Sequence, residues 1–134
     1  MATLPASAVT ELVITDWHSV DWPIKDWIDE SADKLDVQVI QLDGPFNRGR
    51  GRNEAARAAK GDVLLFLDAD SLICPELLTR GLRCVQDGSA YFPILFSYDN
   101  PEHTSGYWRR FGYGNCMINR QAFRKAGGWP ERNS

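Results

Sequence analysis

The sequence predicts an α/β domain in which a mainly parallel sheet is flanked by helices. Short apolar runs suited to strands alternate with longer segments whose apolar residues recur at helical spacing, and this alternation is typical of a parallel sheet. A length of 134 residues is enough for one hydrophobic core. We therefore expect a single domain over residues 1–134, with residues 1–10 flexible because they are poor in strand-forming residues.

Three apolar segments carry the strongest strand signal. They cover residues 11–15, 37–42 and 63–67. The third is almost continuously apolar, which predicts a central strand covered on both faces. Residues 91–96 predict a further strand, which Pro93 confines to a sheet edge or a bulge because proline has no N–H to donate.

Four segments have the residue pattern of helices. They cover residues 22–34, 47–60, 75–88 and 120–126. Pro75 suits a first helical turn, and Gly61 and Gly127 suit positions just beyond helix ends. Residues 97–114 contain aromatic, glycine and charged residues without periodicity, which predicts a loop that carries function or mobility.

The composition excludes several classes of partner and location. A net charge of −3 gives no general attraction for nucleic acid or for an anionic membrane. No apolar run has the roughly 18 residues of a membrane span, and the start of the chain lacks the regions of a signal peptide. A location in the cytoplasm, or on the cytoplasmic face of a membrane through partner proteins, is therefore expected. Cys74, Cys84 and Cys116 fit neither a metal knuckle nor a disulfide framework, which predicts buried free thiols.

Two carboxylates follow the most apolar predicted strand. Asp68 and Asp70 come directly after residues 63–67, where open α/β sheets bind ligands at the carboxyl ends of their strands. Oxygen ligands of this kind suit Mg²⁺ or Mn²⁺, which can bridge a carboxylate and a diphosphate. The alternative is that the two residues only end the strand and start a turn.

A basic cluster precedes this acidic pair. Arg48, Arg50, Arg52 and Arg57 lie around the start of the helix predicted over residues 47–60. Guanidinium groups and a helix N-terminus both bind phosphate well, so a basic helix start beside an acidic strand end favours a nucleotide diphosphate as ligand. The alternative is a solvated helix face.

Three ordered segments resemble the family 2 glycosyltransferases of the GT-A fold. In residues 52–70 an Arg-Asn pair opens a helix, an Ala-x-Gly turn follows, and an apolar strand ends in an Asp-x-Asp motif. Residues 11–19 are similar to the family's second strand and to the acidic turn that contacts the nucleoside. Residues 115–131 are similar to the segment after the donor site, in which a Gly-Gly-aromatic turn is followed by an acid.

The resemblance implies a Rossmann-like GT-A fold and a metal-dependent transfer of a sugar from a nucleotide diphosphate sugar, foremost a UDP-sugar, to an acceptor hydroxyl. It implies that Asp70 binds Mn²⁺ or Mg²⁺ and that Asp68 contacts the metal, a metal-bound water or the ribose. Asp16 is implied to lie near the base. The implied donor-binding residues are Asp16, Trp17, Arg48, Arg52 and Asp68.

The sequence departs from the family at the base-binding turn and at both ends. Trp17 stands where the family commonly has a second acid, and it offers a stacking face instead. The family's first strand and the acid that acts as catalytic base have no counterpart, so the fold is expected to be incomplete at both ends. The remaining candidates for the base are Glu131, Glu102 and Asp99, and donor binding without turnover is an open alternative.

Two further alternatives belong to other functional classes. A non-catalytic remnant would bind the donor or pair its exposed sheet edges with another copy, as a homo-oligomer. The second alternative is a phosphatase of the haloacid dehalogenase type, because residues 67–73 faintly resemble the opening motif of that family. In such an enzyme Asp68 would be a covalent nucleophile. That family's following Gly-Thr pair is absent, as is its later motif of a lysine and an acidic pair.

Overall fold

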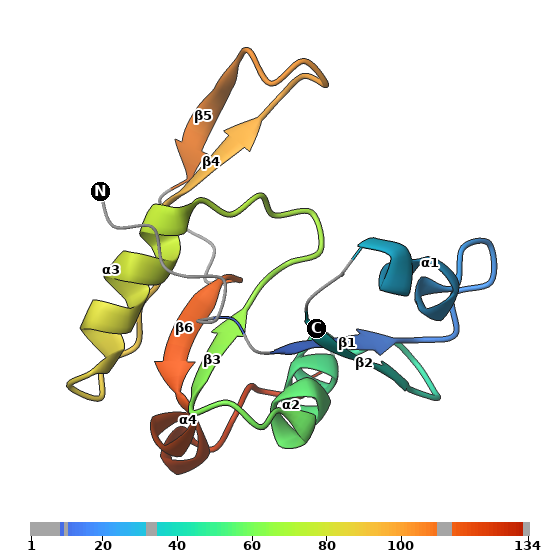
Figure 1. Ribbon diagram of the computed structural model, residues 1–134, viewed down its shortest axis with the longest axis horizontal. Helices are drawn as coiled ribbons and strands as arrows, with labels where there is room; N and C mark the ends of the chain where they lie inside the picture. Colours follow the sequence, from blue (N-terminus) through green and yellow to red (C-terminus); the bar gives the residue numbers. More distant parts are fainter. Residues whose placement is uncertain (1–8, 10, 32–34, 110–113, 133–134) are drawn as a thin grey trace.

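The computed structural model describes residues 9, 11–31, 35–109 and 114–132 (Figure 1). Its elements in chain order are β1 (Glu11–Asp16), α1 (Ile24–Ser31), β2 (Asp36–Gln41), α2 (Arg48–Ala58), β3 (Val63–Phe66), α3 (Pro75–Val85), β4 (Leu95–Tyr98), β5 (Gly106–Arg109), β6 (Cys116–Asn119) and α4 (Arg120–Ala126). The three strongest predicted strands and all four predicted helices are confirmed over the described residues, with small shifts of their ends. Residues 32–34 of the first predicted helix lie outside the described residues, as do residues 1–8 and 10 of the segment expected to be flexible. None of the described helices is long and apolar enough to cross a membrane.

The described strands form three pairs rather than one mainly parallel sheet. β1 and β2 are parallel, with Glu11 opposite Asp36. β3 and β6 are antiparallel, with Phe66 opposite Cys116, and β4 and β5 are also antiparallel. The expected mainly parallel sheet is therefore not confirmed. Apolar periodicity predicts that a segment is a strand but does not specify its direction, which depends on the path of the connecting chain.

β3 is the centre of the packing. On one face, Leu64 and Phe66 are buried in a cluster with Ala56 of α2 and Cys116 of β6. On the other face, Val63 and Leu65 pack against a buried cluster of Leu77, Val85 and Met117. Figure 1 shows α3 on one side of the β3–β6 pair and α2 on the other. The prediction of a strand covered on both faces is confirmed, and this packing holds the end of β3 in place.

The loop expected over residues 97–114 is partly a β-hairpin, and residues 110–113 of it lie outside the described residues. β4 and β5 project from the rest of the fold (Figure 1). Phe96 lies opposite Trp108, with 5.0 Å between ring centroids, and such cross-strand aromatic pairs stabilise a hairpin. The strand expected over residues 91–96 starts later, at Leu95. Each of these strands has only four residues, too few for a clear period-two pattern in the sequence.

The thiols differ in burial. Cys116 is a buried free thiol as predicted, and burial raises its pKa. Cys74 and Cys84 are exposed, so the prediction is wrong for both. Cys74 precedes α3 as its N-cap, and Cys84 lies seven residues after the buried Leu77, at the edge of the face of α3 that also buries Gly81 and Val85. The buried part of this amphipathic helix therefore stops short of the cysteine.

Candidate functional site

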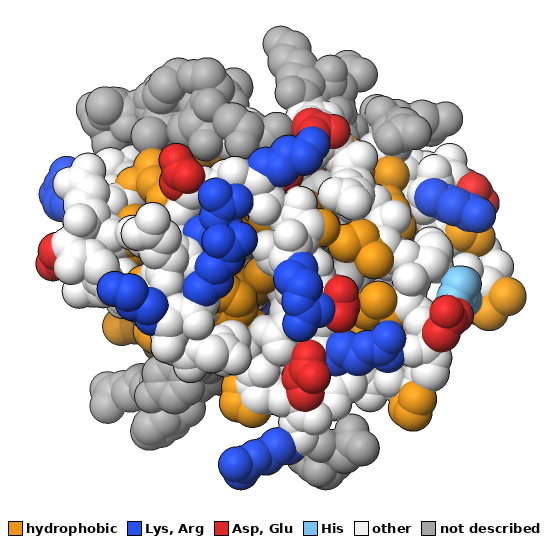
Figure 2. All heavy atoms as spheres, turned by 90° about the horizontal axis from the view of Figure 1, so that it is seen from below, with side chains coloured by type: hydrophobic (Ala, Val, Ile, Leu, Met, Phe, Trp, Pro, Cys, Tyr) orange, Lys and Arg blue, Asp and Glu red, His pale blue; other side chains and the backbone are white. Residues whose placement is uncertain are grey.

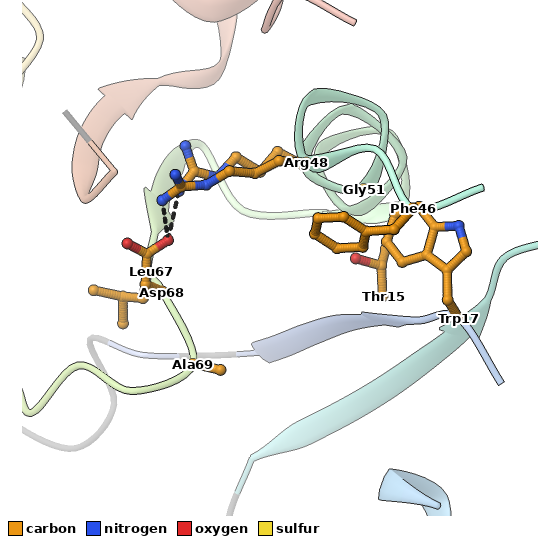
Figure 3. A pocket seen from close by; sticks show the side chains of 9 residues that line it. Thr15, Trp17, Phe46, Arg48, Gly51, Leu67, Asp68 and Ala69 are labelled. Carbon is orange, nitrogen blue, oxygen red and sulfur yellow. Dashed lines mark hydrogen bonds and ion pairs between the residues drawn. The ribbon is translucent and has the colours of Figure 1, made fainter. Parts of the chain in front are cut away.

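The carboxylate of Asp68, just beyond β3, is held by two arginines. Its Oδ1 accepts hydrogen bonds from Nη2 of Arg48 at 2.6 Å and from Nη2 of Arg52 at 2.8 Å (Figure 3). Arg48 and Arg52 lie four residues apart on α2, so both side chains leave the same face of the helix. The predicted juxtaposition of a basic helix start and an acidic strand end is therefore present.

The start of α2 is set by Asn47. Its side-chain oxygen accepts a hydrogen bond from the backbone N–H of Arg50 at 2.8 Å, which is the usual N-cap contact. The other two arginines of the cluster do not reach Asp68. Arg50 donates to the carbonyl of Asp43 at 2.6 Å, and Arg57 pairs with Glu54 one turn away. At the other end, α2 is capped by Ala59 rather than by Gly61.

The two arginines stabilise the ionised form of Asp68. Burial alone would raise the pKa of Asp68, but the hydrogen bond and charge of Arg48, together with those of Arg52, outweigh it and hold the pKa below its usual range. The pKa of Arg52 is lowered, mainly by burial and next by the positive charge of Arg48. The negative charge of Asp68 and its hydrogen bond act in the opposite direction and raise the pKa of Arg52. Asp68 is therefore an ionised acceptor at neutral pH, bonded to two cations.

Two residues that the sequence did not single out complete the surroundings of Asp68. Asn115 is 3% exposed, and its Oδ1 accepts the backbone N–H of Asp68 at 2.9 Å. The carbonyl of Gly114 accepts Nη2 of Arg52 at 2.6 Å. A Cβ on Gly114 would lie 2.5 Å from Oδ2 of Asp68, so a larger residue there would displace this carboxylate. The Gly-Asn dipeptide just before β6 is the sequence signal that could have indicated both.

A pocket of about 460 Å³ extends from this charged contact to an aromatic end. It is lined by Thr15, Trp17, Phe46, Arg48, Gly51, Arg52, Leu67, Asp68 and Ala69. Figure 3 shows Asp68 and Arg48 at one end and Trp17 with Phe46 at the other. The two rings meet edge to face at 4.9 Å between centroids. A Cβ on Gly51 would lie 2.8 Å from the Trp17 ring, so glycine lets the indole lie against α2.

A second pocket of about 650 Å³ adjoins the first. It is lined by Phe46, Asn47, Arg48, Gly49, Arg52, Trp129, Pro130 and Arg132. Phe46, Arg48 and Arg52 line both pockets, so an occupant of one would lie beside an occupant of the other.

The wall of the second pocket is tied to α2 by Asn53. Its Nδ2 donates to the carbonyl of Trp129 at 2.9 Å and to Oε1 of Glu131 at 3.1 Å, and its Oδ1 accepts the Trp129 N–H at 2.8 Å. Arg52 stacks over the Trp129 ring at 4.6 Å from its centroid. The predicted turn after α4 is confirmed at Gly127. The Arg-Asn pair of α2 therefore joins the acidic strand end to the Gly-Gly-Trp turn.

Asp16 does not line either pocket, although its neighbours Thr15 and Trp17 line the first. The residue is 4% exposed, and its Oδ1 accepts the hydroxyl of Ser19 at 2.5 Å and the Ser19 N–H at 3.2 Å. The Ser19 hydroxyl contributes most to lowering the pKa of Asp16, against the effect of burial. Asp16 therefore stabilises the turn after β1 through its bonds to Ser19. The contact of Asp16 with the nucleotide base stays a prediction.

We expect Asp16→Asn to lower the free energy of unfolding by about 1–2 kcal/mol at pH 7, because hydrogen bonds to a charged acceptor are replaced by weaker ones. The pKa of Asp16 is lower in the folded state than its unfolded value of about 3.9. The ionised carboxylate therefore contributes its full stabilisation above a pH of about 3.9, and this stabilisation is lost as the pH falls through the folded-state pKa. Urea titrations from pH 7 to pH 3 should show the gap between wild type and variant closing only in acid. Asp21→Asn, an exposed position in the same connection, is the control and should show no gap.

Asp70 lies at the exposed start of the connection to α3. Within the described residues no hydrogen bond or ion pair holds its carboxylate, so both oxygens are accessible to a cation. No group of three or more His, Cys, Asp or Glu in the described part of the chain could hold a metal by itself. Asp70 lines neither pocket, whereas Asp68 lines the first. Mg²⁺ is commonly bound by one or two carboxylates, waters and substrate phosphates, so a metal role for Asp68 and Asp70 stays a prediction.

The three candidates for a catalytic base lie outside both pockets. The carboxylate of Glu131 accepts a hydrogen bond from Asn53. Asp99 and Glu102 lie in the turn between β4 and β5, where Asp99 accepts the hydroxyl of Ser105. A role for any of them as the base stays a prediction.

Comparison with known proteins gives a consistent assignment. The family described as "Glycosyl transferase family 2" matches residues 9–132. Chondroitin sulfate N-acetylgalactosaminyltransferase 2 of Mus musculus is 31% identical over 124 residues, which cover 76% of this chain and 23% of that protein. Chondroitin sulfate N-acetylgalactosaminyltransferase 1 of Homo sapiens is 32% identical over 122 residues, covering 75% and 23%.

A longer relative gives a similar match. Chondroitin sulfate synthase 3 of Homo sapiens is 30% identical over 114 residues, which cover 72% of this chain and 13% of that protein. The chain thus spans less than a quarter of the length of these curated relatives.

Proposed function

Because this chain belongs to glycosyl transferase family 2, we propose that it binds a UDP-sugar together with Mn²⁺ or Mg²⁺ and transfers the sugar to a hydroxyl of an acceptor glycan. The observation that carries the proposal is the first pocket, which joins a charged end at Asp68, Arg48 and Arg52 to an aromatic end at Trp17 and Phe46. A nucleotide diphosphate has the same two parts, an anionic diphosphate and a flat base.

The charged end suits the diphosphate. Arg48 and Arg52 both bond one oxygen of Asp68, and each guanidinium group has further N–H donors that can bond phosphate oxygens. Asp70, with Asp68 beside it, would hold the divalent metal, which when bound neutralises charge on the departing diphosphate. The arginines would then orient the phosphates and keep their charge compensated as the sugar leaves.

The aromatic end suits the base. Trp17 and Phe46 present ring surface that can stack on a flat heterocycle. A pocket of about 460 Å³ is also within the usual range for a small-molecule site. The acceptor is proposed from the names of the relatives, a chondroitin sulfate N-acetylgalactosaminyltransferase and a chondroitin sulfate synthase, because chondroitin sulfate is a glycan.

Thermal denaturation with ligands tests the proposal. UDP with Mn²⁺ at a hundredfold excess over the Kd should raise the melting temperature by about 10 °C, since ligand binding to the folded state adds about 2.7 kcal/mol. UDP alone, Mn²⁺ alone and ADP with Mn²⁺ should each give a smaller rise. No rise with any nucleotide would contradict the proposal.

The other functional classes separate in simple experiments. Because the chain belongs to glycosyl transferase family 2, the hypothesis that residues 67–73 are a phosphatase motif has no support. A donor-binding remnant would show the thermal shift without sugar transfer, measured as UDP release in the presence of glycan acceptors. Homo-oligomerisation and a cytoplasmic location stay predictions, and sedimentation of the purified chain tests the first.

A further inference from the structure

Asn115 lies immediately before β6 and beside the end of β3. The antiparallel pairing of these strands, with Phe66 opposite Cys116, brings this asparagine next to Asp68, 47 positions earlier in the chain. We infer that Asn115 is a positioning residue for donor binding, because its amide holds the turn that carries Asp68 and Asp70 in one conformation. The inference rests on the proposed function for the identity of the ligand.

The Asp-x-Asp motif forms a closed turn. The backbone N–H of Ser71 donates to the carbonyl of Asp68 at 3.0 Å, and Ala69 and Asp70 occupy the two central positions of this four-residue turn. Every residue from Ala69 to Pro75 except Ser71 is exposed, so side-chain packing does little to fix this part of the chain. The conformation of the turn therefore depends on the bonds at its two ends.

Asn115 bonds both ends of the turn. Its Oδ1 accepts the backbone N–H of Asp68 at 2.9 Å, and its Nδ2 donates to the hydroxyl of Ser71 at 3.0 Å. The orientation of the amide follows from its partners, because a backbone N–H can only donate whereas a hydroxyl oxygen can accept. Asn115 is itself 3% exposed, so an apolar residue in its place would leave the Asp68 N–H without this acceptor in a part-buried position.

The residue before Asn115 holds the basic side of the charged end. The carbonyl of Gly114 accepts Nη2 of Arg52 at 2.6 Å, and Nη2 of Arg52 also bonds Oδ1 of Asp68 at 2.8 Å. One short stretch of chain, Gly114 and Asn115, therefore bonds Asp68, Ser71 and Arg52. The groups that would meet the diphosphate are thus held relative to one another before a ligand arrives.

Exposure alone does not distinguish Asp70 from other acidic residues. Figure 2 shows acidic side chains among Lys and Arg side chains on one face of the molecule, so an exposed carboxylate is an ordinary feature of this surface. Asp70 differs because its backbone belongs to a turn that a buried amide bonds at both ends. A loop that is ordered before binding loses less conformational entropy on binding, and this raises the affinity for the ligand.

Isothermal titration of UDP in the presence of Mn²⁺ tests the inference on the full chain, at a temperature well below unfolding. Asn115→Ala should weaken binding about 10–100-fold, the effect typical of removing a residue that orients metal ligands. Ser71→Ala removes only the bond at the far end of the turn and should weaken binding about three- to tenfold. Ser71→Thr keeps a hydroxyl and should bind UDP more tightly than Ser71→Ala.

Asn100 provides a matched control. Its amide also closes a turn, since Nδ2 donates to Oγ1 of Thr104 at 2.6 Å and Oδ1 accepts the Thr104 N–H at 3.0 Å. This turn joins β4 to β5 and lines neither pocket. Asn100→Ala should therefore lower the stability of the hairpin and leave the affinity for UDP within about twofold of wild type.

Amide hydrogen exchange measures the bond to Asp68 without any ligand. In Asn115→Ala the backbone N–H of Asp68 loses its acceptor and should exchange at least about tenfold faster than in wild type. The amides of β3 that pair with β6 should keep their protection, which shows that the variant is folded. Unchanged exchange at Asp68 would overturn the inference.

The outcomes of the titration separate this inference from the proposed function. Wild-type affinity for UDP in either Asn115→Ala or Ser71→Ala overturns the inference alone, and Ser71→Ala decides if Asn115→Ala does not fold. Absence of UDP binding by the wild type in the presence of Mn²⁺ instead contradicts the proposed function.

Discussion

Asp70→Asn is expected to remove the Mn²⁺-dependent part of the UDP-induced rise in melting temperature. The carboxylate is exposed and makes no contact within the described residues, so the substitution should leave the unliganded melting temperature within about 1 °C. An uncharged amide is a poor ligand for a hard divalent cation, and loss of the ligand should weaken metal-dependent UDP binding at least about tenfold. Calorimetric or fluorescence melting at several Mn²⁺ concentrations measures both effects.

A neutralised carboxylate elsewhere on the surface controls for net charge. Asp87→Asn, at an exposed position beyond α3, should keep the full response to UDP and Mn²⁺. If the Asp70→Asn variant also kept the full response to UDP and Mn²⁺, Asp70 would not be a metal ligand. That result would contradict the metal-binding role of the Asp-x-Asp motif.

Asn53→Ala is expected to lower the free energy of unfolding by about 2–3 kcal/mol. The amide makes three hydrogen bonds, two of them to the backbone N–H and carbonyl of Trp129, and alanine would leave these half-buried groups unpaired. The Trp129 ring also packs on Phe66 and under Arg52, so a loosened turn weakens the contact between α2 and the end of the chain. Urea denaturation should show a lower midpoint with an unchanged slope.

The neighbouring residue of α2 provides the matched control. Glu54→Ala removes only the pair with Arg57 on the same helix and should cost about 0.3–0.5 kcal/mol. A change below about 0.5 kcal/mol for Asn53→Ala would show that the turn is held by ring packing and not by the amide.

Several features of the site were accessible from local sequence. The spacing of Arg48 and Arg52 predicts one helical face, and their position after the N-cap Asn47 predicts that this face lies at the start of α2. The apolar run before Asp68 predicts that this carboxylate follows a buried strand. Each of these inferences concerns residues within one or two helical turns or within one strand. At such short separations the backbone geometry relates the spacing of residues directly to the direction of their side chains.

Other features of the site depend on residues far apart in the chain. The Asp68 carboxylate could be assigned to a metal from its motif, but its two bonds to arginines and the support of Asn115 appear only in the folded structure. Trp17 was singled out and lines the pocket, whereas Asp16 beside it is directed to Ser19. Adjacent residues of a strand point to opposite sides, and only the tertiary structure decides which side faces the pocket.

The sequence by itself determined the elements of this protein: its helices, its apolar strands, the capped start of α2 and the pattern that identifies its family. Tertiary structure alone decided that β6 pairs antiparallel with β3, that residues 106–109 form a hairpin strand, and that the Arg-Asn pair joins Asp68 to Trp129. The physical reason is the range of the interactions. Periodicity and capping act between close neighbours in sequence, whereas strand direction and pocket lining follow from contacts that form when distant segments pack together.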